Sequence, residues 1–210
     1  MYNKIIKAKE LINQHIIDTP FNLSSSLSEI TGNQIYVKYE NRQFTGSFKY
    51  RGSLNKLLSL TIEQRKKGII AMSAGNHAQG LSLGCKLLKI KATIVMPNNT
   101  PFKKIRKNID YGANVIIQGN NVLESEEYVN KMVLKKGLIK IHPFDDYDII
   151  CGQGTLMIEM LKKNPNLKKI YIPVGGGGLI SGCAIVAKSI NKNIKIIGVE
   201  TENFPALYNE

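Results

Sequence analysis

The chain has 210 residues, a net charge of +13 and 43% hydrophobic residues. This length allows one large domain or two small ones, and it needs no disulfides to stabilise the core. No apolar run is long enough to cross a membrane, and three scattered cysteines without a CxxC pair indicate neither a disulfide framework nor a metal site. We therefore expect a protein of the reducing cytoplasm that binds neither a metal ion nor a membrane.

The positive charge comes mostly from dispersed lysines. Only four of the 29 basic residues are arginines, the side chain that contacts phosphates and bases in bidentate fashion. The densest basic cluster, residues 103–107, contains no aromatic residue that could stack on a base. We expect a solvated lysine surface and no nucleic-acid partner. A nucleic-acid binder is the alternative, and a steep salt dependence of DNA retention would support it.

Taken in chain order, the sequence begins with an amphipathic helical pattern that ends at residues 18–20, Asp-Thr-Pro. Short β-branched runs then alternate with helical patterns. The predicted strands are residues 34–39, 68–72, 91–96, 113–118, 138–142, 168–174 and 195–200. The predicted helices are residues 48–59, 76–89, 101–111, 121–136, 153–163 and 178–190. This alternation predicts an α/β fold with parallel sheets, whose ligands bind at the carboxyl ends of the strands.

One lysine stands at the start of the helix predicted at 48–59, in the stretch FTGSFKYRGSLNKLL. The preceding Thr45-Gly46-Ser47 can cap the helix, which would place Lys49 in its first turn. The positive end of the helix and burial both disfavour the ammonium form there. A lysine poised towards neutrality is a base and a nucleophile for carbonyl groups, so Lys49 is a candidate catalytic residue. Phe48 could pack against an aromatic cofactor.

A first glycine turn, SAGNHAQG at residues 73–80, follows the strand that ends at Met72. Gly75 permits a tight turn, and the N–H groups of the next residues are free at the start of a helix. Such a turn binds anions such as a carboxylate. Asn76 and His77 add side-chain donors at the same point. An ordinary capped turn is the alternative.

A second glycine turn, PVGGGGLISG at residues 173–182, lies between a strand and a helix. Its successive N–H groups can converge on a phosphate. The dinucleotide pattern GxGxxG fails, because its sixth position falls on Ile180 or Ser181, and no Walker lysine is present. A phosphate cradle, an anion turn and an activated lysine together suggest pyridoxal 5′-phosphate, whose aldehyde would form a Schiff base with Lys49.

These stretches, with GQGT at residues 152–155, resemble the threonine/serine dehydratase and serine racemase family. The resemblance runs from about Ile12 to Glu200 and is greatest to the short catabolic threonine dehydratases. It implies a two-lobed fold of the tryptophan synthase β type, which is fold type II of the pyridoxal-phosphate enzymes. It also implies β-elimination of water from L-threonine or L-serine. The products would be 2-oxobutyrate or pyruvate, and ammonia.

The resemblance also implies residue roles. Lys49 would hold the cofactor and act as the base at Cα, Phe48 would stack on the cofactor ring, and Asn76 would hydrogen-bond the ring oxygen. Ser73, Asn76 and His77 would take the substrate carboxylate. The phosphate would be held by Gly175, Gly176, Gly177, Gly178 and Leu179. Serine racemases have a serine where this chain has Ala74, so the alanine favours a dehydratase over a racemase.

Relatives of this kind form homo-oligomers and bind an adenine nucleotide at a subunit interface. The matching positions here are Ser24, Ser25, Thr45, Gln79 and Tyr111. A basic residue that relatives place beside the threonine is Phe44 in this chain. This departure removes a phosphate partner and counts against a nucleotide effector.

The resemblance implies a larger domain of residues 1–62 and 147–210 and a smaller domain of residues 65–145, with the cofactor between them. Members of the family continue past the strand at 195–200, so we expect the larger domain to be incomplete at its C-terminal end. A truncated, catalytically impaired fragment is therefore one alternative. A nucleotide-binding oxidoreductase is another, in which Glu200 would contact a ribose, although the failed GxGxxG pattern counts against it.

Overall fold

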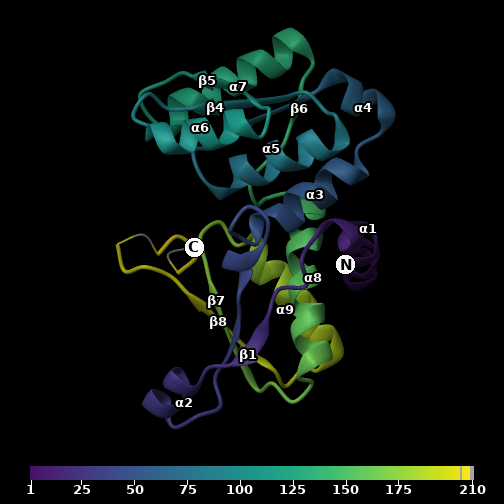
Figure 1. Cartoon of the computed structure of the whole chain (residues 1–210), viewed down its shortest axis with the longest axis vertical. Coiled ribbons are helices and arrows are strands. Elements are labelled where there is room, and N and C mark those ends of the chain that lie inside the picture. The colour runs from purple at the N-terminus through teal and green to yellow at the C-terminus, as the bar shows by residue number, and fades with distance from the viewer. Residues whose placement is uncertain (204, 209–210) are drawn as a thin grey trace.

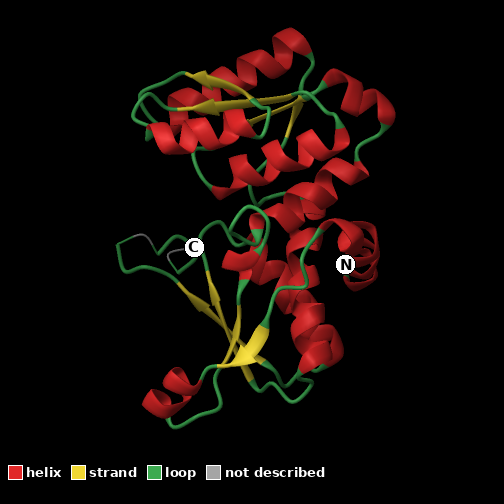
Figure 2. Cartoon of the chain, viewed as in Figure 1, coloured by secondary structure: helices red, strands yellow, loops and turns green. Residues whose placement is uncertain are grey.

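The structure is a computed structural model that describes residues 1–203 and 205–208. Figure 1 shows two bodies stacked along the long axis of the molecule, with α3 (Lys49–Ser59) at their junction. In both bodies, helices flank a small sheet (Figure 2).

The first body contains a four-stranded parallel sheet in the order β5-β4-β3-β6. Its strands are β3 (Ile69–Met72), β4 (Ala92–Met96), β5 (Asn114–Ile117) and β6 (Ile139–Lys140). Its helices are α4 (Ile62–Lys67), α5 (Asn76–Leu88), α6 (Phe102–Asp110) and α7 (Val122–Lys136).

Helices cover both faces of this sheet. Along β3, Ile69 and Ala71 pack into the cluster that contains Leu81 of α5. Between them in sequence, Ile70 packs with Val129 of α7. The alternation follows from the two-residue period of a strand, and it explains why the strand residues are almost all apolar.

The second body contains the parallel pair β7 (Lys169–Pro173) and β8 (Lys195–Val199). Its core joins α1 (Tyr2–Ile12), α8 (Tyr147–Lys163) and α9 (Gly178–Ile190) to these strands. A short antiparallel pair, β1 (Phe21–Leu23) and β2 (Tyr36–Lys38), flanks α2 (Ser25–Thr31). The remaining helical turns are 3₁₀ helices, η1 (Asn13–His15) and η2 (Glu40–Arg42).

Two sequence predictions were wrong in detail, and two helices were not predicted. The strand expected at 34–39 is only β2, and it pairs antiparallel with the unpredicted β1 rather than joining a parallel sheet. The helix expected at 153–163 already begins at Tyr147, where the Asp146 side chain accepts hydrogen bonds from the N–H groups of Asp148 and Ile149. Helices α2 and α4 were not predicted, although the capping box of Thr61 and Gln64 marks the start of α4.

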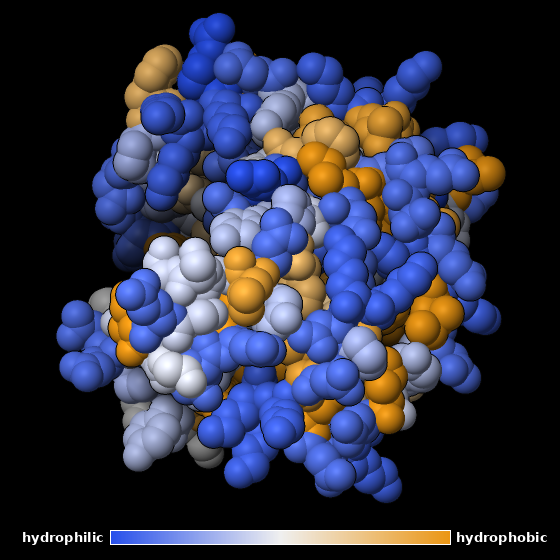
Figure 3. All heavy atoms as spheres, turned by 60° about the horizontal axis from the view of Figure 1, so that its bottom comes forward, coloured by the Kyte–Doolittle hydropathy of each residue, from blue (hydrophilic) through white to orange (hydrophobic). Residues whose placement is uncertain are grey.

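None of the described helices is long and apolar enough to cross a membrane. The face drawn in Figure 3 is mainly hydrophilic, with hydrophobic side chains in small separate groups.

Candidate cofactor site

Lys49 is the first residue of α3 and is half-buried. The N-cap residue is Phe48, which makes no side-chain capping bond, so the cap predicted from Thr45-Gly46-Ser47 is wrong. Ser47 Oγ only accepts a long hydrogen bond of 3.4 Å from the backbone N–H of Lys49. The Lys49 amine donates to the carbonyl oxygen of Pro143 over 2.8 Å and lies 5.5 Å from the centre of the Phe48 ring. Burial lowers the pKa of Lys49, which favours the neutral amine that a base or nucleophile requires.

The loop after β3 presents backbone donors. Ser73 Oγ accepts hydrogen bonds from the N–H groups of Gly75 and Ala78, at 3.2 and 3.3 Å, and so holds the turn. The side chain of Asn76 is exposed at the first position of α5. Among the hydrogen bonds of the described residues, none uses the N–H of Asn76 or His77 as donor. These groups are free to bind an anion at the start of the helix.

His77 lies in a different environment from Asn76. Its side chain is buried, 3% exposed, and Nδ1 lies 3.5 Å from Ser53 Oγ on α3. Nε2 has no partner among the described residues. Burial, assisted by the charge of Lys49, lowers the pKa of His77 to about 3, so the imidazole is neutral. Sequence reasoning missed this burial, because the helical period alone does not say which neighbour covers a residue.

The second glycine turn leads from β7 into α9. Gly177 has a φ of 81°, a left-handed conformation that favours glycine. Within the described residues, no hydrogen bond has a backbone N–H between Gly175 and Ile180 as its donor. A Cβ on Gly176 would lie 2.4 Å from the Phe144 ring, and one on Gly178 would lie 3.0 Å from the Phe144 carbonyl oxygen. The turn therefore has free backbone N–H donors, and it packs so closely against Phe144 that a side chain at Gly176 or Gly178 would clash.

Residues 143 and 144 connect the lysine to the glycine turn. Pro143 accepts the hydrogen bond of the Lys49 amine, and the next side chain, Phe144, lies against Gly176. The sequence Pro143-Phe144-Asp145-Asp146 predicts a turn that could cross between two lobes, but it does not predict a contact with Lys49. A signal was present, because the segment follows β6 and so lies at the carboxyl end of a parallel strand.

The positions considered for a nucleotide lie on several elements. Thr45 and Gln79 are buried, and their side-chain oxygens Oγ1 and Oε1 have no partner among the described residues. Ser24 caps α2 by accepting a hydrogen bond from the N–H of Leu27, and Ser25 begins that helix. Tyr111 follows the end of α6.

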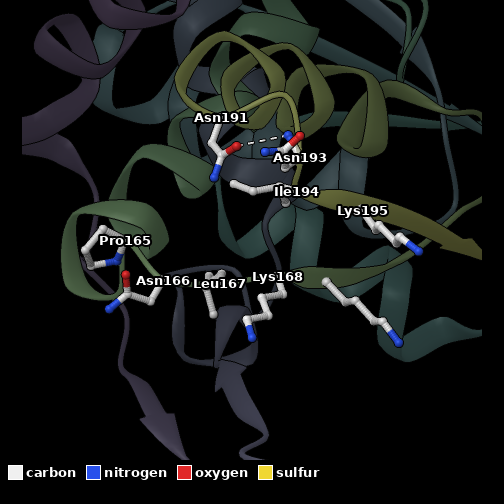
Figure 4. A pocket seen from close by; sticks show the side chains of 9 residues that line it. Pro165, Asn166, Leu167, Lys168, Asn191, Asn193, Ile194 and Lys195 are labelled. Carbon is white, nitrogen blue, oxygen red and sulfur yellow. Dashed lines mark hydrogen bonds between the residues drawn. The ribbon is translucent and has the colours of Figure 1, made fainter.

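A hollow of about 640 Å³ lies at the other end of β7 and β8 from the glycine turn (Figure 4). It is lined by residues 165–169, by Asn191 and by residues 193–195, and these include Lys168, Lys169 and Lys195. None of the predicted site residues is among them. The hollow is at the amino ends of the strands, whereas ligands of α/β sheets bind at the carboxyl ends.

Residues 12–210 match the family described as pyridoxal-phosphate dependent enzymes. The chain belongs to this family. It is 46% identical over 203 residues to an L-threonine ammonia-lyase of Thermotoga maritima, covering 97% of this chain and 51% of the relative. It is 48% identical over 200 residues to the catabolic L-threonine dehydratase TdcB of Staphylococcus aureus strain USA300, covering 95% of this chain and 58% of the relative. The chain thus spans about half the length of these curated relatives.

Solved structures of family members share the fold. Serine racemase from Dictyostelium discoideum superposes with a TM-score of 0.92 at 38% identity, covering 97% of this chain and 66% of that one. The processed threonine deaminase isoform 2 of Solanum lycopersicum superposes with a TM-score of 0.91 at 39% identity, covering 95% of this chain and 55% of that one. These likenesses confirm the predicted fold type II architecture.

The family membership also confirms pyridoxal 5′-phosphate as the cofactor. The residues present fit it. Four glycines leave their N–H groups free for the phosphate. The Lys49 amine, whose pKa is lowered by burial, is held near the same turn through Pro143 and Phe144. The roles of the individual residues remain predictions.

Proposed function

We propose that this chain carries the lysine and the phosphate cradle of an enzyme that deaminates L-threonine or L-serine by eliminating water. The observation that supports this most is the half-buried Lys49 amine, whose pKa is lowered and which contacts the segment packed on the glycine turn. The names of the two relatives, an L-threonine ammonia-lyase and an L-threonine dehydratase, point to the same reaction.

When bound, pyridoxal phosphate supplies an electron sink for the charge that develops at the substrate Cα. Lys49 would take the proton from Cα, and burial lowers the pKa of its amine, which favours the neutral form that accepts a proton. Phe48 would cover the cofactor ring, and Asn76 would donate to the ring oxygen. The free N–H groups of Gly175–Gly178 and Leu179 bind the phosphate at the start of α9. The β-hydroxyl would leave with a proton as water, and the released enamine would become an imine. One water molecule would then hydrolyse this imine to 2-oxobutyrate from threonine, or pyruvate from serine, and ammonia.

The loop after β3 orients the substrate carboxylate. Ser73 holds the turn in place. The free N–H groups of Asn76 and His77 lie at the positive N-terminal end of α5 and bind the anion there. The neutral, buried His77 imidazole supports the loop by packing against α3 near Ser53. In this proposal its backbone, rather than a charged ring, contacts the carboxylate.

Ala74 decides between elimination and racemisation in this proposal. A racemase needs a proton carrier on each side of Cα, and Lys49 is the carrier on one side only. Ala74 has no proton to donate, so we expect little D-serine from L-serine. Ala74→Ser should add racemisation. Efficient formation of D-serine by the unchanged chain would show that another group does this work.

The two bodies of the fold are proposed as domains, a larger one of residues 1–62 and 147–210 and a smaller one of residues 65–145. We further propose a cytoplasmic homo-oligomer. The unpaired oxygens of Thr45 and Gln79 are compatible with an adenine nucleotide effector, whereas Phe44 counts against one. Equilibrium dialysis with adenosine monophosphate, comparing the chain with Gln79→Leu, tests this part.

Absorbance and trapping test the main proposal. The purified chain with pyridoxal phosphate should absorb near the Schiff-base wavelength, and borohydride should fix the cofactor on Lys49. Deamination of L-threonine and L-serine is then measured. Fixation without turnover would support the alternative of a cofactor-binding fragment with impaired catalysis. A colourless chain that cannot be reconstituted would contradict the proposal.

A further inference from the structure

The turn between β6 and α8 is organised by one imidazole. His142 Nδ1 accepts hydrogen bonds from the backbone N–H of Asp145 over 2.8 Å and from that of Phe144 over 3.4 Å. The same ring makes an edge contact with the Phe144 ring, with centroids 4.6 Å apart and planes at 78°. One side chain therefore fixes both the backbone and the aromatic side chain of the turn.

This turn makes two contacts with the cofactor residues. Its Pro143 carbonyl accepts the hydrogen bond of the Lys49 amine, and its Phe144 ring lies against Gly176. These contacts come from consecutive residues and point at different parts of the site. A change in the turn would therefore move the partner of the lysine and the neighbour of the phosphate cradle together.

We propose that His142 is a positioning residue, which holds the Pro143–Phe144 segment so that the Lys49 amine and the glycine turn keep the spacing that the cofactor requires. It does not touch the reacting atoms. It acts by supplying a hydrogen-bond acceptor to the turn and a surface to Phe144. For an imidazole to accept two N–H bonds at Nδ1, the proton of the neutral ring must be on Nε2. The effect of His142 on cofactor binding rests on the proposed function, whereas its hydrogen bonds to the turn do not.

Two substitutions separate the acceptor from the ring. His142→Phe keeps an aromatic ring beside Phe144 but removes the acceptor. His142→Asn keeps a side-chain oxygen that accepts from the N–H two or three residues later, as in an Asx turn, but removes the ring. His15→Phe is the matched control, because His15 is also half-buried but lies in η1, away from this turn.

The first measurement is amide hydrogen exchange of the chain without cofactor. We expect His142→Phe to speed amide exchange at Asp145 by about tenfold, because the variant loses one or two hydrogen bonds. His142→Asn should keep most of the protection of this amide. His15→Phe should leave it unchanged. Equal exchange at Asp145 in the original chain and His142→Phe would overturn the proposal, as would an Asn variant that exchanges as fast as the Phe variant.

The second measurement is the dissociation constant of pyridoxal phosphate, with pyridoxal as the probe that lacks a phosphate. His142→Phe should weaken pyridoxal phosphate binding by about tenfold, and His142→Asn by less. Unchanged binding in His142→Phe, despite faster exchange at Asp145, would overturn the positioning role. If the original chain binds no pyridoxal phosphate, the proposed function fails, while the exchange experiment still decides whether His142 holds the turn.

Discussion

Burial shifts the pKa values of two ionisable residues of the candidate site. Lys49 is half-buried and His77 is buried, and burial lowers both pKa values because moving a charged group out of water costs free energy. For Lys49 this favours the base that the proposed reaction needs. For His77 it removes a charge next to that lysine, which would otherwise lower the pKa of Lys49 further.

Removing the Lys49 amine tests its proposed role directly. Lys49→Ala should abolish borohydride fixation of the cofactor and lower deamination by roughly a thousandfold, in the range for loss of a general base. Lys66→Ala removes an exposed lysine amine and should change neither result. Fixation at an unchanged level in Lys49→Ala, located by peptide mapping, would identify a different lysine.

Two neighbouring glycines offer a matched comparison. A Cβ at Gly176 would overlap the Phe144 ring at 2.4 Å, whereas one at Gly175 meets nothing within 4 Å. Gly176→Ala should therefore destabilise the cofactor-free chain by about 1 to 3 kcal/mol, the usual cost of overpacking. Gly175→Ala should cost less than about 1 kcal/mol. Urea unfolding without cofactor measures both, and equal midpoints would show that Phe144 moves aside freely.

The helix that carries Lys49 is held by close backbone contacts. A Cβ on Gly52 would lie 2.8 Å from the carbonyl oxygen of Ile149, and one on Gly152 would lie 2.6 Å from that of Arg51. Because these positions are glycines, the backbones of α3 and α8 can pack directly against each other. Two helices that touch in this way have little freedom to shift, so the start of α3 keeps Lys49 in a fixed place.

A buried ion network reinforces the same helix. Arg51 is fully buried and binds Glu40 and Glu159, with Nε to Glu40 Oε2 and Nη1 to Glu159 Oε1 both at 2.8 Å. Lys38 and Lys9 also contact Glu159. Burial alone raises the pKa of Glu159, but Arg51, Lys38 and Lys9 outweigh it and lower the pKa to about 2. The network joins α1, β2, η2, α3 and α8.

The pH dependence of stability follows from this network. The folded pKa of Glu159 lies below the unfolded value of 4.5, so its contribution is complete above pH 4.5 and is lost as the pH falls towards 2. The shift corresponds to roughly 3 kcal/mol. Denaturant unfolding at several pH values should show a loss of this order between pH 5 and pH 2 that is much smaller in Glu159→Gln.

At neutral pH, Glu159→Gln should destabilise the chain by about 3 to 5 kcal/mol, because it leaves the buried Arg51 with less countercharge. Asp110→Asn is the control. It breaks the ion pair between Arg106 and Asp110, whose side chains are 65% and 55% exposed, and should cost less than about 0.5 kcal/mol. Equal losses in the two variants would contradict the importance of the buried network.

Across the whole molecule, the candidate site is assembled from the carboxyl ends of strands in both bodies. The loops after β3, β6 and β7 contribute Ser73 to His77, Pro143 with Phe144, and the glycine turn. Figure 1 shows α3 between the two bodies. A ligand that contacts these loops would link segments far apart in the sequence and stabilise both bodies.

Ligand addition tests this linkage. Pyridoxal phosphate at a hundred times its dissociation constant should stabilise the chain by about 2.7 kcal/mol, or roughly 5 to 10 °C in melting temperature. Pyridoxal at the same concentration should give a smaller shift because it lacks the phosphate. Gly176→Ala should reduce the shift with pyridoxal phosphate. A melting temperature that is independent of pyridoxal phosphate would argue against a site shared by both bodies.

The sequence by itself determined the features that depend on residues close together in the chain. The alternation of strands and helices, the two glycine turns and the position of Lys49 at a helix start follow from the side-chain period and from residues that break or cap elements. Signals of this kind lie within a few residues of one another. They were sufficient for the fold class, the family and the cofactor.

Only the tertiary structure decided which neighbours cover these residues. It paired β1 with β2, buried His77 against α3, and placed Phe144 on Gly176 and Glu159 beside Arg51. The last two contacts join residues 32 and 108 positions apart in the chain. No local pattern encodes them, because they depend on how whole elements pack. That packing lowers the pKa values of Lys49 and His77 through burial, and it lowers the pKa of Glu159 through its ion pairs with Arg51, Lys38 and Lys9.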